Sequence, residues 1–195
     1  MVVVCSASVL NNRNRSSARV TELIALIGLP GSGKSTVGRQ LARRLQFAFV
    51  DSDHAIEEQI GPSIREYFER EGEERFRDIE EAVIDQLTQE HTGVIATGGG
   101  AVLRSANRQH LRERTQVVYL TSSPDELFRR LRQDVNRPLL QVADPLNRLH
   151  ELHAVRDPLY RETANFVIET GRHSSTTLVN MILVQLELAG GVPSP

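Results

Sequence analysis

The sequence predicts an α/β fold, in which one five-stranded parallel sheet carries helices on both faces and a small lid. Short apolar runs alternate along the chain with segments whose apolar residues recur at helical spacing, and this order favours right-handed strand–helix–strand units. Glycines or carboxylates follow the first three apolar runs, which is where sheets of this kind bind ligands. A length of 195 residues is enough for one such domain with a sizeable core.

Each predicted strand is a short apolar run that a glycine or a polar residue ends. Residues 23–27 read LIALI before Gly28, a composition typical of a strand buried on both faces of a parallel sheet. Residues 47–50 lead into Asp51 in the same way. The predicted strands are residues 23–27, 47–50, 94–96, 117–120 and 165–169.

The segments between the strands have helical periodicity. Residues 37–45 place their apolar side chains on one side, as an amphipathic helix does. Ser123, followed by Pro124 and then Glu126, is a helix-start signal, whereas Pro158 predicts a kink or a stop. Helices are predicted at residues 37–45, 55–59, 64–70, 74–89, 149–161 and 176–188, with a polar helix before residue 117 and another that starts at Ser123.

The chain divides into one predicted domain, residues 21–189, and two ends. Residues 136–147 contain two prolines and no clear periodicity, so they are the predicted lid. Residues 1–20 are expected to form a flexible N-terminal extension. They precede the first acidic residue, Glu22, which keeps a transit peptide as the alternative. Residues 190–195 are expected to be a frayed tail.

Composition excludes several classes of function. The formal net charge of −2 provides no basic field for nucleic acid. Cys5 is the only cysteine, so neither an internal disulfide nor a cysteine-based zinc site is possible, and a reducing compartment is suitable. No apolar run approaches the ~18 residues that a membrane span needs. We therefore expect a monomeric, cytoplasmic protein that binds neither nucleic acid nor membrane.

One basic residue differs from all the others. Of the 23 basic residues, only Lys34 is a lysine, and the rest are arginines. A position that keeps a compact ammonium group in such an arginine-rich chain indicates a need for a point charge rather than a planar fork.

Gly28–Ser35 carries the phosphate-binding motif G-x-x-x-x-G-K-[ST], here GLPGSGKS. Its glycines let the backbone turn N–H groups toward phosphate oxygens, and the following helix adds its positive end. Lys34 would reach the β- and γ-phosphates of ATP, and Ser35 would bind Mg²⁺. The alternative is an ordinary glycine turn, but the position between a predicted strand and helix favours a P-loop NTPase-type fold. The predicted ATP-binding residues of this segment are Gly31, Ser32, Gly33, Lys34, Ser35 and Thr36.

Two carboxylates, Asp51 and Asp53, follow the second predicted strand. Beside a phosphate loop, one can hold Mg²⁺ through water while the other orients or deprotonates an attacking alcohol. The alternative is that Asp53 only caps the next helix. The nearby loop favours the functional interpretation, and the predicted reaction is then phosphoryl transfer from ATP to a small alcohol.

Glycines and arginines provide weaker signals. Residues 98–100 are three glycines after a buried strand, where backbone N–H groups can approach a ligand closely. Arginine holds phosphate or carboxylate through its planar fork, but sequence chemistry alone does not choose among the candidates. These candidates are Arg75, Arg77, Arg137 and Arg156.

Six motifs together resemble the shikimate kinases. In order along the chain they are GLPGSGKSTVGRQLARRL, DSD, EGEERFRDIE, ATGGG, NRPLL and RDPLY. The similarity covers about residues 22–188. The phosphate loop alone indicates only a superfamily, whereas the later motifs distinguish this family. The sequence departs from the family pattern in its N-terminal extension and at Val135-Asn136 in the lid, where charged residues are common.

The resemblance implies that ATP, with Mg²⁺ as cofactor, phosphorylates the 3-hydroxyl of shikimate. It makes Asp51 the water-linked magnesium partner beside Ser35. It also implies that Lys34, Asp53 and the lid residue Arg137 are catalytic, and that Arg137 contacts the phosphates. The residues that it assigns to shikimate are Asp53, Arg77, Gly98, Gly99, Gly100 and Arg156, with Glu80 as a weaker match, while Arg130 and Pro138 match positions near the adenine.

Two other interpretations stay open. A gluconate kinase, or another kinase of a small metabolite, would share the fold and the phosphate loop. A nucleotide-dependent binding protein could keep the same fold without catalysis. Such a protein, however, needs no acceptor pocket formed by Asp53, Arg77 and Arg156.

Overall fold

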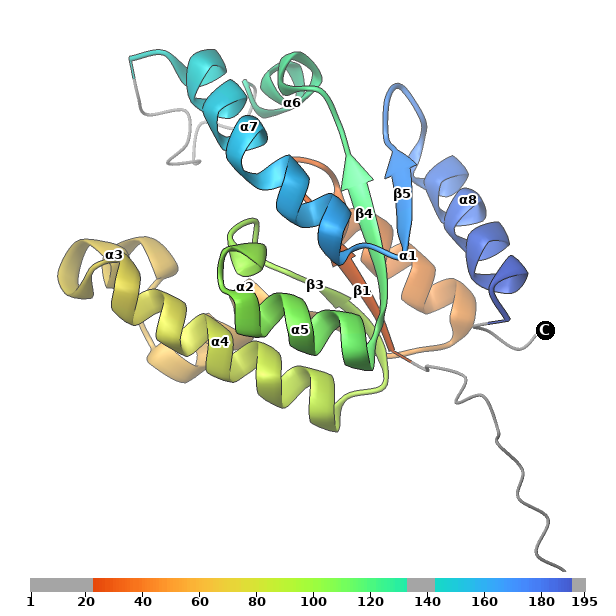
Figure 1. The fold of residues 1–195 in the computed structure, drawn as a ribbon, viewed down its shortest axis with the longest axis horizontal. Helices are drawn as coiled ribbons and strands as arrows, with labels where there is room; N and C mark the ends of the chain where they lie inside the picture. The colour runs from red at the N-terminus through yellow and green to blue at the C-terminus, as the bar shows by residue number, and fades with distance from the viewer. Residues whose placement is uncertain (1–22, 133–142, 191–195) are drawn as a thin grey trace, which may run out of the picture.

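The computed structural model describes residues 23–132 and 143–190, which Figure 1 draws in colour. The predicted N-terminal extension lies outside these residues. So does most of the predicted lid, including Arg137 and Pro138, and nearly all of the predicted tail.

One sheet of five strands runs through the described part of the chain, and every strand pair in it is parallel. The strand order is β2-β3-β1-β4-β5, which confirms the parallel sheet predicted from the alternating segments. β1 is buried along its whole length because it pairs with β3 on one side and with β4 on the other. The strands are β1 (Leu23–Ile27), β2 (Phe49–Asp51), β3 (Gly93–Ala96), β4 (Gln116–Thr121) and β5 (Phe166–Glu169).

Helices connect the strands in the predicted order. The start signal at Ser123 is confirmed, because its hydroxyl accepts a hydrogen bond from the Glu126 N–H. Within the described ranges, none of these helices is long and apolar enough to cross a membrane. The helices are α1 (Lys34–Leu45), α2 (Ser52–Ile60), α3 (Ile64–Glu71), α4 (Glu73–Glu90), α5 (Ser105–Arg114), α6 (Pro124–Leu131), α7 (Pro145–Thr163) and α8 (Ser175–Leu188), with a short 3₁₀ turn, η1, at Ala101–Leu103.

β2 lies later in the sequence than predicted. The backbone N–H of Phe47 donates to the Ala42 carbonyl at 2.8 Å, so this residue takes part in the C-terminal cap of α1 rather than in a strand. Pairing with β3 starts at Phe49 and continues to Asp51. Asp51 is therefore the last residue of the strand, and α2 begins immediately after it.

Of the predicted kink or stop at Pro158, the stop is wrong, since α7 continues through this residue. Proline has no N–H for the carbonyl of Ala154, but both residues are exposed, so water can satisfy that carbonyl. Leu152 and Tyr160 are buried in the core on either side of the proline and hold the helix against the sheet. α7 also begins at Pro145, inside the predicted lid.

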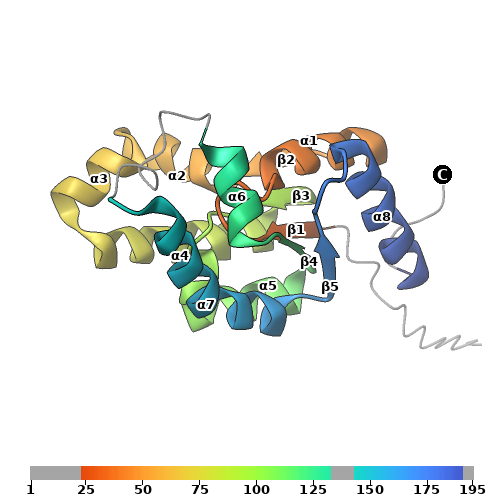
Figure 2. The same cartoon turned by 90° about the horizontal axis from the view of Figure 1, so that it is seen from above.

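Two apolar clusters fill the two faces of the sheet (Figure 2). α5, α6 and α7 pack on one face, and α1 and α8 pack on the other. β1 contributes to both because its side chains alternate: Ala25 and Ile27 belong to the first cluster, and Ile24 and Leu26 to the second. α2, α3 and α4 share a third, smaller cluster. This packing leaves the carboxyl ends of the strands for the site.

Gly93, at the start of β3, allows a close backbone approach. Its φ is +127°, and a β-carbon there would collide with the carbonyl oxygen of Ala48. Gly61 also has a positive φ, +87°, but nothing lies within 4 Å of its added β-carbon. Substitution at Gly61 therefore tests backbone strain alone, whereas substitution at Gly93 tests strain together with crowding.

We expect Gly93→Ala to lower the free energy of unfolding by at least ~1 kcal/mol more than Gly61→Ala. Both variants acquire backbone strain, but only Gly93→Ala also forces a β-carbon against a fixed backbone atom. Denaturant unfolding of the two variants measures the difference. Equal losses of stability would contradict the close approach between β3 and the segment before β2.

Candidate active site

The carboxyl ends of three neighbouring strands bring the predicted site together. β2, β3 and β1 are adjacent and parallel, so the segments that follow them emerge at one edge of the sheet. These segments and Arg130 of α6 line a pocket of about 440 Å³. The predicted residues in its wall are Gly31, Gly33, Lys34, Ser35, Thr36, Asp51, Asp53, Gly99 and Arg130.

The loop between β1 and α1 presents backbone groups to this pocket. Gly28, Gly31 and Gly33 have φ values of 146°, 83° and 95°, which residues with side chains rarely adopt. Gly33 is the N-cap of α1, and neither a side-chain cap nor an acidic residue occupies the first turn, an arrangement that suits an anion. The Nζ of Lys34 donates to the carbonyl oxygens of Gly28 at 2.8 Å and Leu29 at 3.0 Å. The ammonium group therefore lies over the loop that would hold phosphates.

Ser35 and Asp51 meet at the junction of the loop and β2. The Ser35 hydroxyl donates to Oδ2 of Asp51 at 2.6 Å. The other oxygen of Asp51, Oδ1, accepts from the Asp53 N–H at 3.2 Å and caps α2. The alternative that Asp53 is the helix cap is therefore wrong. Asp51 is the cap, because α2 starts directly at the end of β2, and the Asp53 side chain lines the pocket.

The oxygen atoms of Ser35 and Asp51 form a donor set that fits Mg²⁺, which prefers hard oxygen ligands. No group of three or more histidine, cysteine or acidic side chains able to hold a metal occurs in the described ranges. A magnesium ion at this pair would therefore take its remaining ligands from phosphate and water.

The surroundings of Asp53 make its carboxyl harder to ionise than that of an ordinary aspartate. Burial, and next the charge of Asp51, raise the pKa of the Asp53 carboxyl to about 6, while Lys34 opposes the change. Glu80 and Glu57 raise this pKa further. The group is ionised at neutral pH yet more basic than an ordinary aspartate, which is the tuning that a general base needs.

The guanidinium group of Arg77 is held by two glutamates. Its Nη1 donates to Glu80 Oε2 at 2.6 Å, while Nε and Nη2 donate to one oxygen of Glu73 at 3.3 and 2.9 Å. Burial alone would lower the pKa of Arg77, but the two glutamates raise it above its ordinary value. Of the five N–H donors of an arginine, one on each terminal nitrogen is left after these contacts among the described residues. That pair of donors matches the two oxygens of a carboxylate.

Arg156 and Tyr160 of α7 reach the glycine segment from the other side. The Nη1 of Arg156 donates to the Gly99 carbonyl at 2.9 Å, and the Tyr160 hydroxyl donates to the same oxygen at 2.6 Å. Arg156 also acts on the buried carboxyl of Glu80. Burial raises the pKa of this carboxyl, while the charges of Arg77 and Arg156 lower it. Both arginines therefore converge on the same part of the site from different helices.

The three glycines after β3 lie against Asp53, the phosphate loop and Arg77. An added β-carbon at any of them would displace a functional group or the phosphate loop. It would lie 2.5 Å from Asp53 Oδ1 at Gly98 and 2.7 Å from Pro30 Cδ at Gly99, and it would overlap the Arg77 guanidinium at Gly100.

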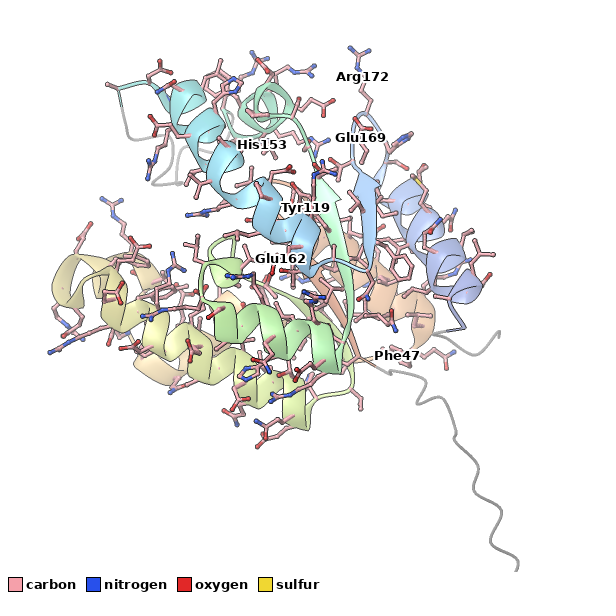
Figure 3. The ribbon with its side chains drawn as sticks, viewed as in Figure 1. Phe47, Tyr119, His153, Glu162, Glu169 and Arg172 are labelled. Atoms are coloured by element: carbon pink, nitrogen blue, oxygen red, sulfur yellow. The ribbon has the colours of Figure 1, made fainter. Side chains whose placement is uncertain are left out.

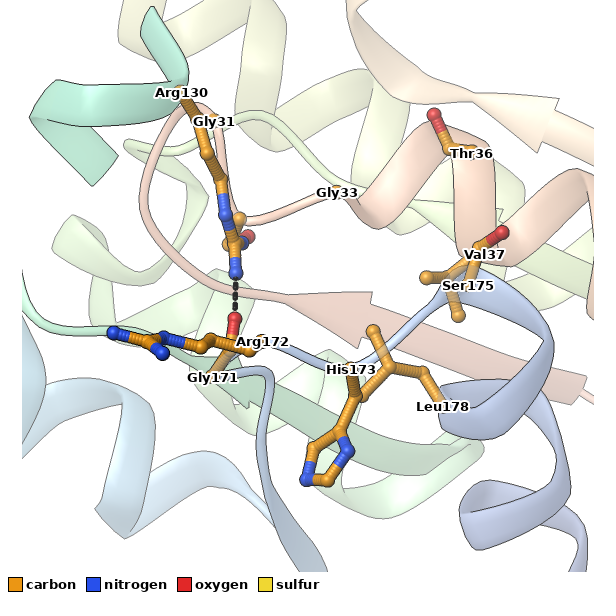
Figure 4. Close-up of a pocket in the computed structure, with 11 residues that line it drawn as sticks. Gly31, Gly33, Thr36, Val37, Arg130, Gly171, Arg172, His173, Ser175 and Leu178 are labelled. Carbon is orange, nitrogen blue, oxygen red and sulfur yellow. Dashed lines mark hydrogen bonds between the residues drawn. The ribbon is translucent and has the colours of Figure 1, made fainter. Parts of the chain in front are cut away.

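A second pocket, of about 330 Å³, continues from the phosphate loop toward β5 and α8 (Figure 4). Arg130 crosses it, and its guanidinium donates to the Gly171 carbonyl and, at 3.1 Å, to the Thr170 hydroxyl. Val37 and Leu178 provide an apolar wall. A polar cation beside an apolar wall suits a flat heterocyclic base next to the phosphates.

Sequence reasoning missed the residues that the β5–α8 loop brings to this second pocket. They follow the fifth predicted strand at the same edge of the sheet, which was the available signal. Arg75, in contrast, lies on the exposed surface of α4 and pairs with Glu71, so it is not part of the site. The missed residues are Gly171, Arg172, His173 and Ser175.

Comparison with known proteins identifies close relatives. A family model described as shikimate kinase matches residues 30–187. A shikimate kinase of Paracidovorax citrulli is 61% identical over 176 residues, which cover 88% of this chain and 96% of the relative. One from Ralstonia nicotianae is 57% identical over 172 residues, or 88% and 90% of the two chains. The solved structure of a shikimate kinase from Acinetobacter baumannii, in complex with shikimate, superimposes with a TM-score of 0.82 at 45% identity and covers 88% of this chain and 95% of its own.

Asp53 should make the stability of the protein depend on pH. Folding raises its pKa from 3.8 to about 6, so the protonated carboxyl stabilises the fold at low pH, and this contribution is lost as the pH rises through about 6. We expect the melting temperature of Asp53→Asn to match the wild type near pH 4, to exceed it increasingly up to about pH 6, and to exceed it by a constant margin from about pH 7 to pH 8.

The melting curves need a control for the loss of one negative charge. Asp78→Asn provides it, because this carboxylate is exposed on α4. A gap between Asp53→Asn and the wild type that stays constant from pH 4 to pH 8 would contradict the raised pKa.

Proposed function

Because this chain belongs to the shikimate kinase family, we propose that ATP occupies the two pockets and that shikimate lies beside its phosphates, against Gly98, Gly99 and Gly100. The chain is a kinase: it transfers the γ-phosphoryl group of ATP to the 3-hydroxyl of shikimate, giving shikimate 3-phosphate and ADP. The observation that carries this proposal is the position of Asp53. Its carboxylate lines the same pocket as Lys34 and the phosphate loop. Gly98 lies against both Asp53 and Glu80, and Glu80 holds Arg77, which forms the proposed arginine clamp together with Arg156.

The nucleotide is proposed to occupy the phosphate loop and the second pocket. The backbone of Gly31, Ser32 and Gly33 and the first turn of α1, which includes Thr36, surround the phosphates. Lys34 neutralises charge on the β- and γ-phosphates. The base lies toward Arg130, whose guanidinium already faces that pocket.

Magnesium is proposed at the Ser35–Asp51 pair. The Ser35 hydroxyl would be a direct ligand, and Asp51 would hold a bound water while it also caps α2. When bound, the ion neutralises negative charge on the phosphates and helps to orient them.

The acceptor is proposed to lie against the three glycines. The free donors of Arg77, together with Arg156, bind the substrate carboxylate and fix the ring, while Gly98, Gly99 and Gly100 let it approach the backbone. The oxygen of the 3-hydroxyl then bonds to the γ-phosphorus while the bond from this phosphorus to ADP breaks. Asp53 receives the proton that the hydroxyl loses. Orientation of the two partners is the larger part of this catalysis.

Further features are proposals from the sequence and the family. Residues 21–189 form one kinase domain, and the lid, about residues 136–147, covers the site. Arg137 of this lid contacts the phosphates during transfer. Water is a competing acceptor, and a closed lid excludes it. The enzyme is expected to act as a monomer in the cytoplasm, where ATP is available.

Asp53→Asn tests the proposed reaction. Since the amide keeps the size of the side chain but neither its charge nor its basicity, we expect the turnover number with shikimate to fall ~10²–10⁴-fold. The Michaelis constant for ATP should stay the same, because Asp51 rather than Asp53 caps α2. Steady-state kinetics, with the exposed Asp78→Asn as the control, measures both. Near-normal turnover in Asp53→Asn would mean that this carboxylate does not activate the acceptor.

A further inference from the structure

We propose that Tyr160 is a positioning residue for the acceptor site. In this proposal, which rests on the proposed function, its hydroxyl holds the Gly99 carbonyl in place and so frees Arg156 to bind the carboxylate of the substrate. The two residues are four positions apart on α7, so they lie on the same face of the helix.

Two donors converge on one carbonyl oxygen. The Tyr160 hydroxyl lies 2.6 Å from the Gly99 oxygen, and Arg156 Nη1 lies 2.9 Å from it. A carbonyl oxygen has two lone pairs and can accept both bonds. Without a substrate, Arg156 is therefore held by an internal acceptor at the edge of the site.

Gly99 is the point where the two halves of the site touch. A β-carbon on it would lie 2.7 Å from Pro30 Cδ, so the glycine packs directly on the phosphate loop. Its carbonyl faces the opposite side, toward α7. The orientation of this one peptide therefore fixes the distance between the phosphate loop and the arginine clamp.

The ring of Tyr160 is itself fixed. It has no exposed surface and stacks on Tyr119 of β4, with 4.9 Å between the ring centroids and 26° between the planes. Figure 3 shows Tyr119 beside α7. The Tyr119 hydroxyl donates to Asp157 Oδ1 at 2.9 Å, which ties the stack to the helix next to Arg156. Burial also raises the pKa of Tyr160 above its ordinary value, so its hydroxyl remains a donor.

This arrangement lowers the free-energy cost of moving Arg156 from Gly99 to the substrate. If Arg156 were the only donor, its departure would leave a half-buried carbonyl without a partner, and an unpaired carbonyl is costly. Tyr160 keeps that oxygen satisfied while Arg156 turns to the carboxylate. The carbonyl also stays in one orientation, so the backbone under the substrate does not move.

Tyr160→Phe removes only the hydroxyl and keeps the stacked ring. We expect the Michaelis constant for shikimate to rise ~3–10-fold, the effect of one hydrogen bond, because Arg156 is then retained on Gly99. The turnover number should change less than twofold, and the Michaelis constant for ATP should not change, since the phosphate loop keeps its contacts.

Tyr119→Phe is the matched control. It removes the other hydroxyl of the same stack, whose partner is Asp157 rather than Gly99, and it should change the Michaelis constant for shikimate less than twofold. Melting temperatures of both variants show how much each hydroxyl contributes to stability.

Three results would overturn the proposal: an unchanged constant for shikimate in Tyr160→Phe, equal rises in the constants for shikimate and ATP, or equal effects of the two variants. These failures are distinct from failure of the proposed function. If the proposed function were wrong, the wild type itself would not phosphorylate shikimate.

Discussion

The site depends on the close approach that three consecutive glycines permit after β3. A parallel sheet brings the ends of its strands to one edge, but this alone leaves the side chains of neighbouring loops several ångströms apart. Here Asp53 and Glu80 pack against the backbone of Gly98. Pro30 of the phosphate loop packs against Gly99, and the guanidinium of Arg77 packs against Gly100. The donor and acceptor halves of a shikimate kinase are therefore packed on one short piece of backbone.

The charges of the site are arranged around that backbone. The charge of Lys34 acts on the carboxyl of Asp53, and Arg77 lies between Glu80 and Glu73. Arg77 thus has acidic partners before any ligand binds, which limits the cost of burying it. The unfavourable electrostatics fall on Asp53, because burial and neighbouring negative charges raise the pKa of its carboxyl to about 6. The ligand-free site therefore holds one carboxylate that is more basic than an ordinary aspartate.

The sequence predicted most of the fold and of this site, because those parts depend on local signals. Alternating apolar runs predicted the five strands, and the phosphate-binding motif predicted the loop around Lys34. Features that depend on tertiary contacts could not be read in this way. Whether Asp51 or Asp53 caps α2 depends on where β2 ends, which the pairing with β3 sets. α7 continues through Pro158 because the core holds it on both sides. The role of Tyr160 depends on a contact with Gly99, 61 residues away in sequence.

An acceptor screen tests the central claim most directly. The release of ADP by the wild-type enzyme would be measured with shikimate, gluconate, a nucleoside monophosphate and water alone, at one concentration of ATP and Mg²⁺. Because the proposed function places a carboxylated ring alcohol between Arg77, Arg156, the glycine segment and Asp53, shikimate should release ADP far faster than the other acceptors, with water slowest. Equal rates with gluconate or a nucleoside monophosphate, or a rate that does not depend on the acceptor, would contradict this account.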